Sequence, residues 1–179
     1  MRDIHRIHIT GASGSGTTTL GQALAKQLQF AVLDADDFFW EPTTPPYQKK
    51  RNKPERMALI LQALSDHPKA IVSGSISGWG AELEQSFDLV IFLTVRTEVR
   101  IQRLLAREQA KLGYIDHEFI TWAGQYDAGG LEMRSRALHE KWLADLSCPV
   151  VRLDGENPVA TSVDAVLRAI SLDIFRFDK

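Results

Sequence analysis

Residues 11–19 read Gly-Ala-Ser-Gly-Ser-Gly-Thr-Thr-Thr and directly follow an apolar stretch that ends at Thr10. Glycines at this density let the backbone curl so that its N–H groups point inward. A helix is expected from Gly16 to Gln29, and its N-terminus adds the positive end of the helix dipole. A strand, a tight turn and a helix in this order make a cradle for phosphate oxygens, so the segment predicts a phosphate site.

The glycine spacing matches the phosphate-binding loop, or P-loop, G-x-x-x-x-G-K-[ST], with one departure. Thr17 stands where the motif has lysine, and Thr18 supplies the hydroxyl that binds Mg²⁺ in such loops. The missing lysine leaves two interpretations open: a catalyst that takes its positive charge from elsewhere, and a loop that binds nucleotide with little transfer. The residues expected to bind the nucleotide here are Gly11, Ser13, Gly14, Ser15, Gly16, Thr17, Thr18 and Thr19.

Composition narrows the classes of function. The chain has 179 residues, of which 44% are hydrophobic and 25% are charged, as in an ordinary single-domain globular protein. A formal net charge of −2 gives no general attraction to nucleic acid or acidic membranes, and no apolar run is long enough to span a bilayer. The chain has one cysteine and no apolar signal-peptide core near its N-terminus. We therefore expect a cytoplasmic protein that binds neither nucleic acid nor membrane.

Strands and helices alternate along the whole chain, which is typical of an α/β fold with a parallel sheet covered by helices on both faces. The polar segments 37–56 and 113–130 interrupt the alternation, and their length suggests functional loops in a single domain of residues 1–179. Strands are expected at 5–10, 31–34, 70–73, 89–93 and 150–153, and helices at 16–29, 54–64, 97–112, 131–146 and from 157 onwards.

This order of elements, together with the loop at 11–18, resembles the small P-loop kinases of the adenylate kinase and shikimate kinase group over nearly the whole chain. The resemblance implies a five-stranded parallel sheet in the order 2-3-1-4-5. It also implies an enzyme that transfers the γ-phosphoryl group of ATP, bound with Mg²⁺, to a small acceptor. The alternative function is a nucleotide-binding module or weak NTPase with a degenerate P-loop.

Two aspartates, Asp34 and Asp36, follow the second expected strand, and Asp34 lies seventeen residues after Thr17. Shikimate kinases carry a similar D-x-D at this distance. The resemblance implies that Asp34 positions Mg²⁺ through water and that Asp36 orients or deprotonates the acceptor hydroxyl. The alternative interpretation is a solvated acidic turn.

Arg103 and Arg107 lie four residues apart on the expected helix 97–112, so they share one helical face. Adenylate kinases have a similar R-x-x-x-R at this place. The resemblance implies that Arg103 packs against the nucleotide base and that Arg107 meets phosphate oxygens, two roles that suit a guanidinium group. Alternatively, both arginines belong to a solvated basic face beside Glu108.

Arg134 and Arg136 come directly after the polar segment 113–130, where this group of kinases has a lid that closes over the phosphates. Lid closure excludes water and delivers positive charge, which the threonine at position 17 does not supply. Arg107, Arg134 and Arg136 are therefore the expected catalytic cations, with the cluster 49–51 as a further source. The alternative is that Arg134 and Arg136 pair with acidic neighbours on a helix surface.

The segment 73–80 departs from the nucleoside monophosphate kinases, which have D-G-[FY]-P-R there, because it contains no arginine. The acceptor is therefore not defined by the resemblance. We expect it between Asp36, the segment 37–56 and the turn 74–80, with Trp40 and Trp79 beside it. Arg51 and Arg56 are candidates for holding an anionic acceptor.

Overall fold

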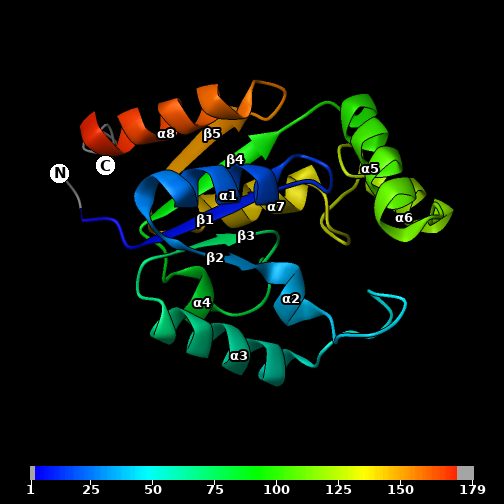
Figure 1. Ribbon diagram of the computed structural model, residues 1–179, viewed down its shortest axis with the longest axis horizontal. Coiled ribbons are helices and arrows are strands. Elements are labelled where there is room, and N and C mark those ends of the chain that lie inside the picture. The colour runs from blue at the N-terminus through cyan, green and yellow to red at the C-terminus, as the bar shows by residue number, and fades with distance from the viewer. Residues whose placement is uncertain (1–2, 173–179) are drawn as a thin grey trace.

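The computed structural model describes residues 3–172 and is built on one five-stranded, entirely parallel sheet (Figure 1). The strand order is β2-β3-β1-β4-β5, which confirms the predicted topology. The central strand β1 pairs with β3 on one side and with β4 on the other. The strands are β1 (Arg6–Gly11), β2 (Ala31–Asp34), β3 (Ala70–Ser73), β4 (Leu89–Thr94) and β5 (Val150–Asp154).

Helices cover both faces of the sheet, and two of them extend beyond its carboxyl edge. Helices α1 and α8 contribute to the core on one face, whereas α3, α4 and α7 contribute to the core on the other. Helices α5 and α6 lie past the strand ends, at the right of Figure 1. The helices are α1 (Thr17–Leu28), α2 (Ala35–Phe39), α3 (Lys53–Asp66), α4 (Ala81–Glu84), α5 (Thr97–Leu112), α6 (His117–Gly124), α7 (Arg136–Ala144) and α8 (Val159–Leu172).

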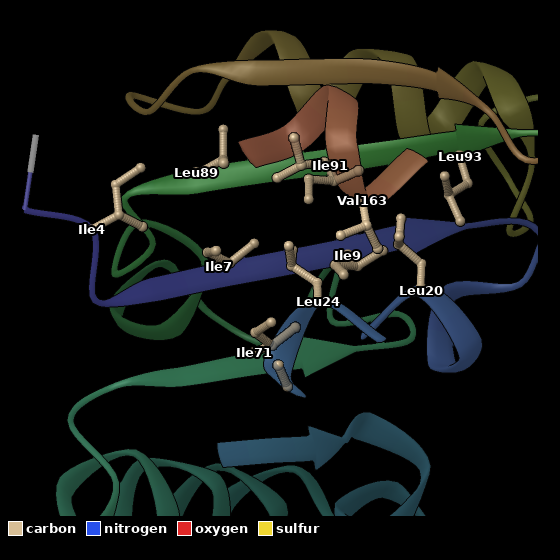
Figure 2. Close-up of a cluster of buried hydrophobic side chains, with 12 residues drawn as sticks. Ile4, Ile7, Ile9, Leu20, Leu24, Ile71, Leu89, Ile91, Leu93 and Val163 are labelled. Atoms are coloured by element: carbon tan, nitrogen blue, oxygen red, sulfur yellow. The ribbon is translucent and has the colours of Figure 1, made fainter. Parts of the chain in front are cut away.

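The core follows from the alternation of side chains along each strand. Ile7 and Ile9 of β1 point to the α1 and α8 face, where they meet Leu24 and Val163 (Figure 2). Between them, the imidazole of His8 points to the opposite face and is fully buried. Because β1 is covered on both sides, it holds the P-loop that follows it in a fixed position.

The expected helices need four corrections. Helices α2, α4 and α6 were not predicted, and α7 begins at Arg136 rather than at 131. All are too short to give a clear helical period. Three of them begin at a side-chain cap: Asp34 caps α2, Asp116 caps α6 and Ser135 caps α7. Within residues 3–172, no helix combines the length and apolar character needed to cross a bilayer.

Candidate active site

The P-loop leaves the carboxyl end of β1 and enters α1 through two glycines with positive φ, Gly14 at 83° and Gly16 at 94°. A Cβ atom on Gly14 would lie 2.8 Å from the carbonyl oxygen of Arg100, so a larger residue does not fit. Gly16 precedes Thr17, the first residue of α1, and no side chain caps this helix start. Its free N–H groups are therefore available to a phosphate group.

The remaining predicted P-loop residues line the same turn. Ser15 is buried, Ser13 and Thr17 are half-buried, and Thr19 is exposed at the side of the loop. A Cβ atom on Gly11 would lie 2.6 Å from the carbonyl oxygen of Leu93, which accounts for the glycine at the end of β1. The backbone geometry is therefore that of a phosphate-binding turn, with a threonine hydroxyl at position 17.

Thr18 and Asp34 meet where α1 and α2 begin. The Thr18 hydroxyl donates to Asp34 Oδ2 at 3.1 Å, and Asp34 Oδ1 accepts the backbone N–H of Asp36 at 3.0 Å. A hydroxyl and a carboxylate are hard oxygen ligands of the kind that Mg²⁺ takes together with water and phosphate oxygens. Residues 3–172 contain no cluster of three His, Cys, Asp or Glu side chains that would hold a metal by itself. The donor set therefore fits a metal that arrives with a nucleotide.

Asp36 lies in an electrostatic cluster with two of the predicted arginines. Asp36 is exposed to solvent at one side, but partial desolvation of its carboxyl raises the pKa and the charge of Asp34 raises it further, while Arg134 and Arg107 act in the opposite direction. A carboxylate with a raised pKa is a stronger base than one in water, which suits it to accept a proton from a hydroxyl group.

Arg134 reaches the P-loop from the segment between α6 and α7. Its Nη2 atom donates to the carbonyl oxygen of Gly11 at 2.9 Å. Burial lowers the pKa of this guanidinium, whereas the neighbouring Asp36 raises it. Arg134 therefore brings a positive charge to the base of the loop that lacks the usual lysine.

Arg136 does not join this cluster. Its side chain is exposed and lines a separate pocket of about 500 Å³ with Asp127 and Glu156. Ser135 is the N-cap of α7, so Arg134 belongs to the preceding loop, whereas Arg136 is the first residue of the helix. The structure thus separates Arg136 from Arg134, although the sequence analysis grouped them.

Arg103 and Arg107 lie on the exposed face of α5. Arg103 donates to the Gly155 carbonyl oxygen at 3.0 and 3.1 Å and lines a pocket of about 260 Å³ with Thr19 and Asn157. This pocket adjoins the P-loop and has the position expected for a base. Arg107 is half exposed and pairs with Glu108 at 3.2 Å, so it is not held against the P-loop as Arg134 is.

The acceptor side is rich in aromatic and basic residues. The Arg56 guanidinium lies against the rings of both Phe39 and Trp79, 4.9 and 4.7 Å from their centroids. Its buried Nε atom has no hydrogen-bond partner among the described residues, and the same is true of Arg51 Nε. Lys50 lies 5.8 Å from the Trp40 ring centroid. The expected acceptor region therefore contains cations held in place by stacking.

A contact joins this region to α5. Tyr47, in the segment 37–56, has its hydroxyl 2.5 Å from Lys111 Nζ near the end of that helix. Lys49 points away, since it pairs with Glu41 on the surface. Of the basic cluster 49–51, Lys50 and Arg51 remain near the expected acceptor region.

The sequence analysis missed Arg100, Tyr126 and His139. Arg100 is fully buried, and the hydroxyl of Tyr126 lies 2.7 Å from His139 Nδ1 inside the protein. For Arg100 a signal was present: it precedes Leu104 and Glu108 by four and eight residues, and these three form the buried stripe of α5. Tyr126 and His139 gave no comparable signal, because Tyr126 lies in the expected loop 113–130 and His139 lies in the helix that follows it.

Comparison with known proteins agrees with this fold. The family model described as an AAA domain matches residues 7–119. The chain belongs to this family. It is 44% identical over 175 residues to the uncharacterized protein YqaC of Bacillus subtilis, a match that covers 92% of this chain and 97% of the relative. It is also 29% identical over 124 residues to a cytidylate kinase of Archaeoglobus fulgidus, covering 63% and 67% of the two chains.

Solved structures place the fold among small P-loop kinases. A shikimate kinase from Acinetobacter baumannii superposes with a TM-score of 0.65 at 16% identity, covering 98% of this chain and 97% of that one. A gluconokinase from Sinorhizobium meliloti gives 0.57 at 15% identity and covers 98% of both chains. These likenesses establish a nucleotide and shikimate kinase-like P-loop fold, whereas the acceptor differs among its members.

Proposed function

We propose that this protein is a kinase that transfers the γ-phosphoryl group of ATP to a small-molecule acceptor. The observation that carries the proposal is the meeting of a glycine-rich turn, the Thr18–Asp34 pair and the Asp36–Arg134 pair at one sheet edge. In open α/β sheets, ligands bind at the carboxyl ends of the strands, and these groups all lie there. Named relatives that are kinases support the same reaction class.

Each group of residues has its own role in the proposed reaction. The turn 11–18 binds the phosphates through its backbone N–H groups, with Arg103 beside the base pocket. Thr18, and Asp34 through water, would hold Mg²⁺, which neutralises charge on the phosphates when it is bound. Asp36 accepts the proton of the acceptor hydroxyl as that oxygen attacks the γ-phosphorus.

Arg134 would replace the missing lysine of the P-loop. Its guanidinium already lies at Gly11, and its charge acts on Asp36, so it can approach both the phosphates and the acceptor. Arg107 acts on Asp36 as well but is more exposed, and we assign it a smaller contribution. Arg136 stays a weaker candidate that would need to turn toward the phosphates.

The acceptor carries a hydroxyl and, we propose, an anionic group. Arg56 and Arg51 each keep a buried Nε donor without a partner among the described residues, although Arg51 Nη1 pairs with Glu55 at 3.1 Å. The rings of Phe39 and Trp79 both contact the guanidinium of Arg56 and hold it in place, so it can bind an anion with little loss of side-chain freedom.

An acceptor screen by ADP release tests the function. Hydroxy acids, sugar acids, nucleosides and nucleoside monophosphates are each added to the wild type and to Asp36→Asn with Mg²⁺ and ATP. We expect ADP formation that rises with one acceptor class and falls in the variant. Slow ADP formation that no acceptor accelerates would instead favour a nucleotide-binding module, the alternative that Thr17 raises.

A further inference from the structure

Arg100 is the largest side chain that the described part of the protein buries completely. Its guanidinium makes hydrogen bonds to atoms from several segments. It donates to Val95 O after β4 at 3.2 Å, to Ala123 O in α6 at 3.1 Å and to Asp127 Oδ2 at 2.9 Å. A buried arginine needs such partners because an unpaired charge in the interior is strongly unfavourable.

The P-loop also contacts Arg100. The carbonyl oxygen of Ser13 lies 3.5 Å from Arg100 Nη1, at the long end of hydrogen-bond range. Gly14 packs against the Arg100 backbone so closely that only glycine fits, as described above. In a loop whose N–H groups point toward a phosphate, carbonyl groups point outward, and Arg100 lies on that outer side.

Arg100 also contacts the segment that runs from α6 to Asp127. The Arg100 guanidinium lies 5.2 Å from the centroid of the Tyr126 ring. Asp127 Oδ2 accepts from both Arg100 and Thr97, so this carboxylate closes the network. A lysine could not make all these contacts, since it lacks the planar fork of donors that guanidinium has.

We propose that Arg100 is a positioning residue that couples the P-loop to the segment 117–127. The packing of α6 and the ordering of the P-loop then depend on each other, because the Arg100 side chain contacts both. The proposal rests on the proposed nucleotide binding for its role in the reaction. The coupling itself is a property of the protein without nucleotide.

Asp127→Asn is the first test, because it changes a partner in 117–127 and leaves the P-loop residues untouched. Amide hydrogen exchange is followed in residues 11–16 of the nucleotide-free protein. We expect exchange there to become about tenfold faster, as for the loss of one charge-assisted hydrogen bond. Unchanged exchange in 11–16, with faster exchange confined to 117–127, would overturn the coupling.

Arg100→Lys is the second test, with Arg152→Lys as its matched control. Arg152 also makes a two-pronged ion pair, to Glu140, but on the surface. Calorimetry should show Mg²⁺-bound ATP binding to Arg100→Lys about tenfold or more weakly, with the control unchanged. Nucleotide should protect 117–127 from exchange in the wild type and not in Arg100→Lys.

The outcomes separate the two proposals. If Arg100 had only a structural role, Arg100→Lys would lower the melting temperature. The ATP affinity and the nucleotide-induced protection of 117–127 would stay as in the wild type. If Arg100→Lys does not fold, Thr97→Val removes a single partner and takes its place in both measurements. If the wild type binds no nucleotide, the proposed function fails, and the exchange of 11–16 in Asp127→Asn still decides the coupling.

Discussion

The Mg²⁺ dependence of ATP binding should depend mainly on the hydroxyl of Thr18. It lies against Asp34, and no other hydroxyl of the described chain donates to that carboxylate. We expect Thr18→Ala to weaken ATP binding about tenfold in Mg²⁺ and to leave binding in EDTA unchanged. Calorimetry in the two buffers measures this difference. Equal losses with and without Mg²⁺ would remove Thr18 from the metal site.

Position 17 tests where the positive charge comes from. Because Arg134 already donates to Gly11 O, a lysine introduced by Thr17→Lys would add a charge where one is present. We expect turnover to change by less than about tenfold, whereas loss of a needed arginine finger costs on the order of 10³–10⁵. The control is Arg134→Lys in the wild-type background. A large gain in Thr17→Lys would show that the natural site is disabled.

Asp36 should set the pH dependence of transfer. A general base must be ionised, and partial desolvation raises the pKa of this carboxyl, so kcat should rise with pH until Asp36 is fully ionised. Asp36→Asn should reduce transfer by about 10²-fold or more and spare ATP affinity. Initial rates across pH, once an acceptor is known, measure both effects. A normal rate in the variant leaves Asp36 with a local structural role only.

At the scale of the elements, the strands were predictable and the short helices were not. Strands β3 and β4 are almost wholly apolar, and β2 and β3 have the predicted bounds. Helix α6 lies in a segment that we expected to lack structure, because Gly113 and Gly124 surround a stretch with little apolar period. The pairing of Thr18 with Asp34 followed from topology, whereas the separation of Arg134 from Arg136 depended on where α7 begins.

The cap of α6 gives a prediction at this scale. Asp116 Oδ1 accepts the backbone N–H of Phe119 at 3.0 Å. Asp116→Ala should cost about 1 kcal/mol, which for a protein of this size lowers Tm by about 2–4 °C. Asp164→Ala, an exposed position inside α8, serves as the control in thermal unfolding. An unchanged Tm would mean that α6 does not depend on its cap.

At the scale of the whole molecule, two buried histidines should make stability depend on pH. Burial lowers the pKa of His8 to about 4 and that of His139 to about 3. The unfolded chain titrates near 6.5, so it binds more protons than the folded protein as the pH falls below that value. Stability is therefore complete above about pH 6.5 and is lost below it, by about 2 kcal/mol for each histidine at pH 5.

Urea unfolding between pH 7 and pH 5 measures this loss. His8→Leu should reduce the dependence by about half, because a leucine among Phe87 and Trp142 removes one titrating group and His139 still titrates. His67→Gln, at an exposed position, should keep the wild-type slope. The same slope in His8→Leu would assign the acid sensitivity to other groups.

The contact between Tyr47 and Lys111 sets a limit on molecular size. It joins the segment beside the proposed acceptor region to the helix that carries Arg103 and Arg107. The two side chains therefore meet at the side from which an acceptor would enter. An acceptor must therefore be narrow enough to pass beside the tyrosine or must separate the two residues to enter. A free metabolite meets the first condition, whereas a residue within a folded protein or a nucleic acid strand meets only the second.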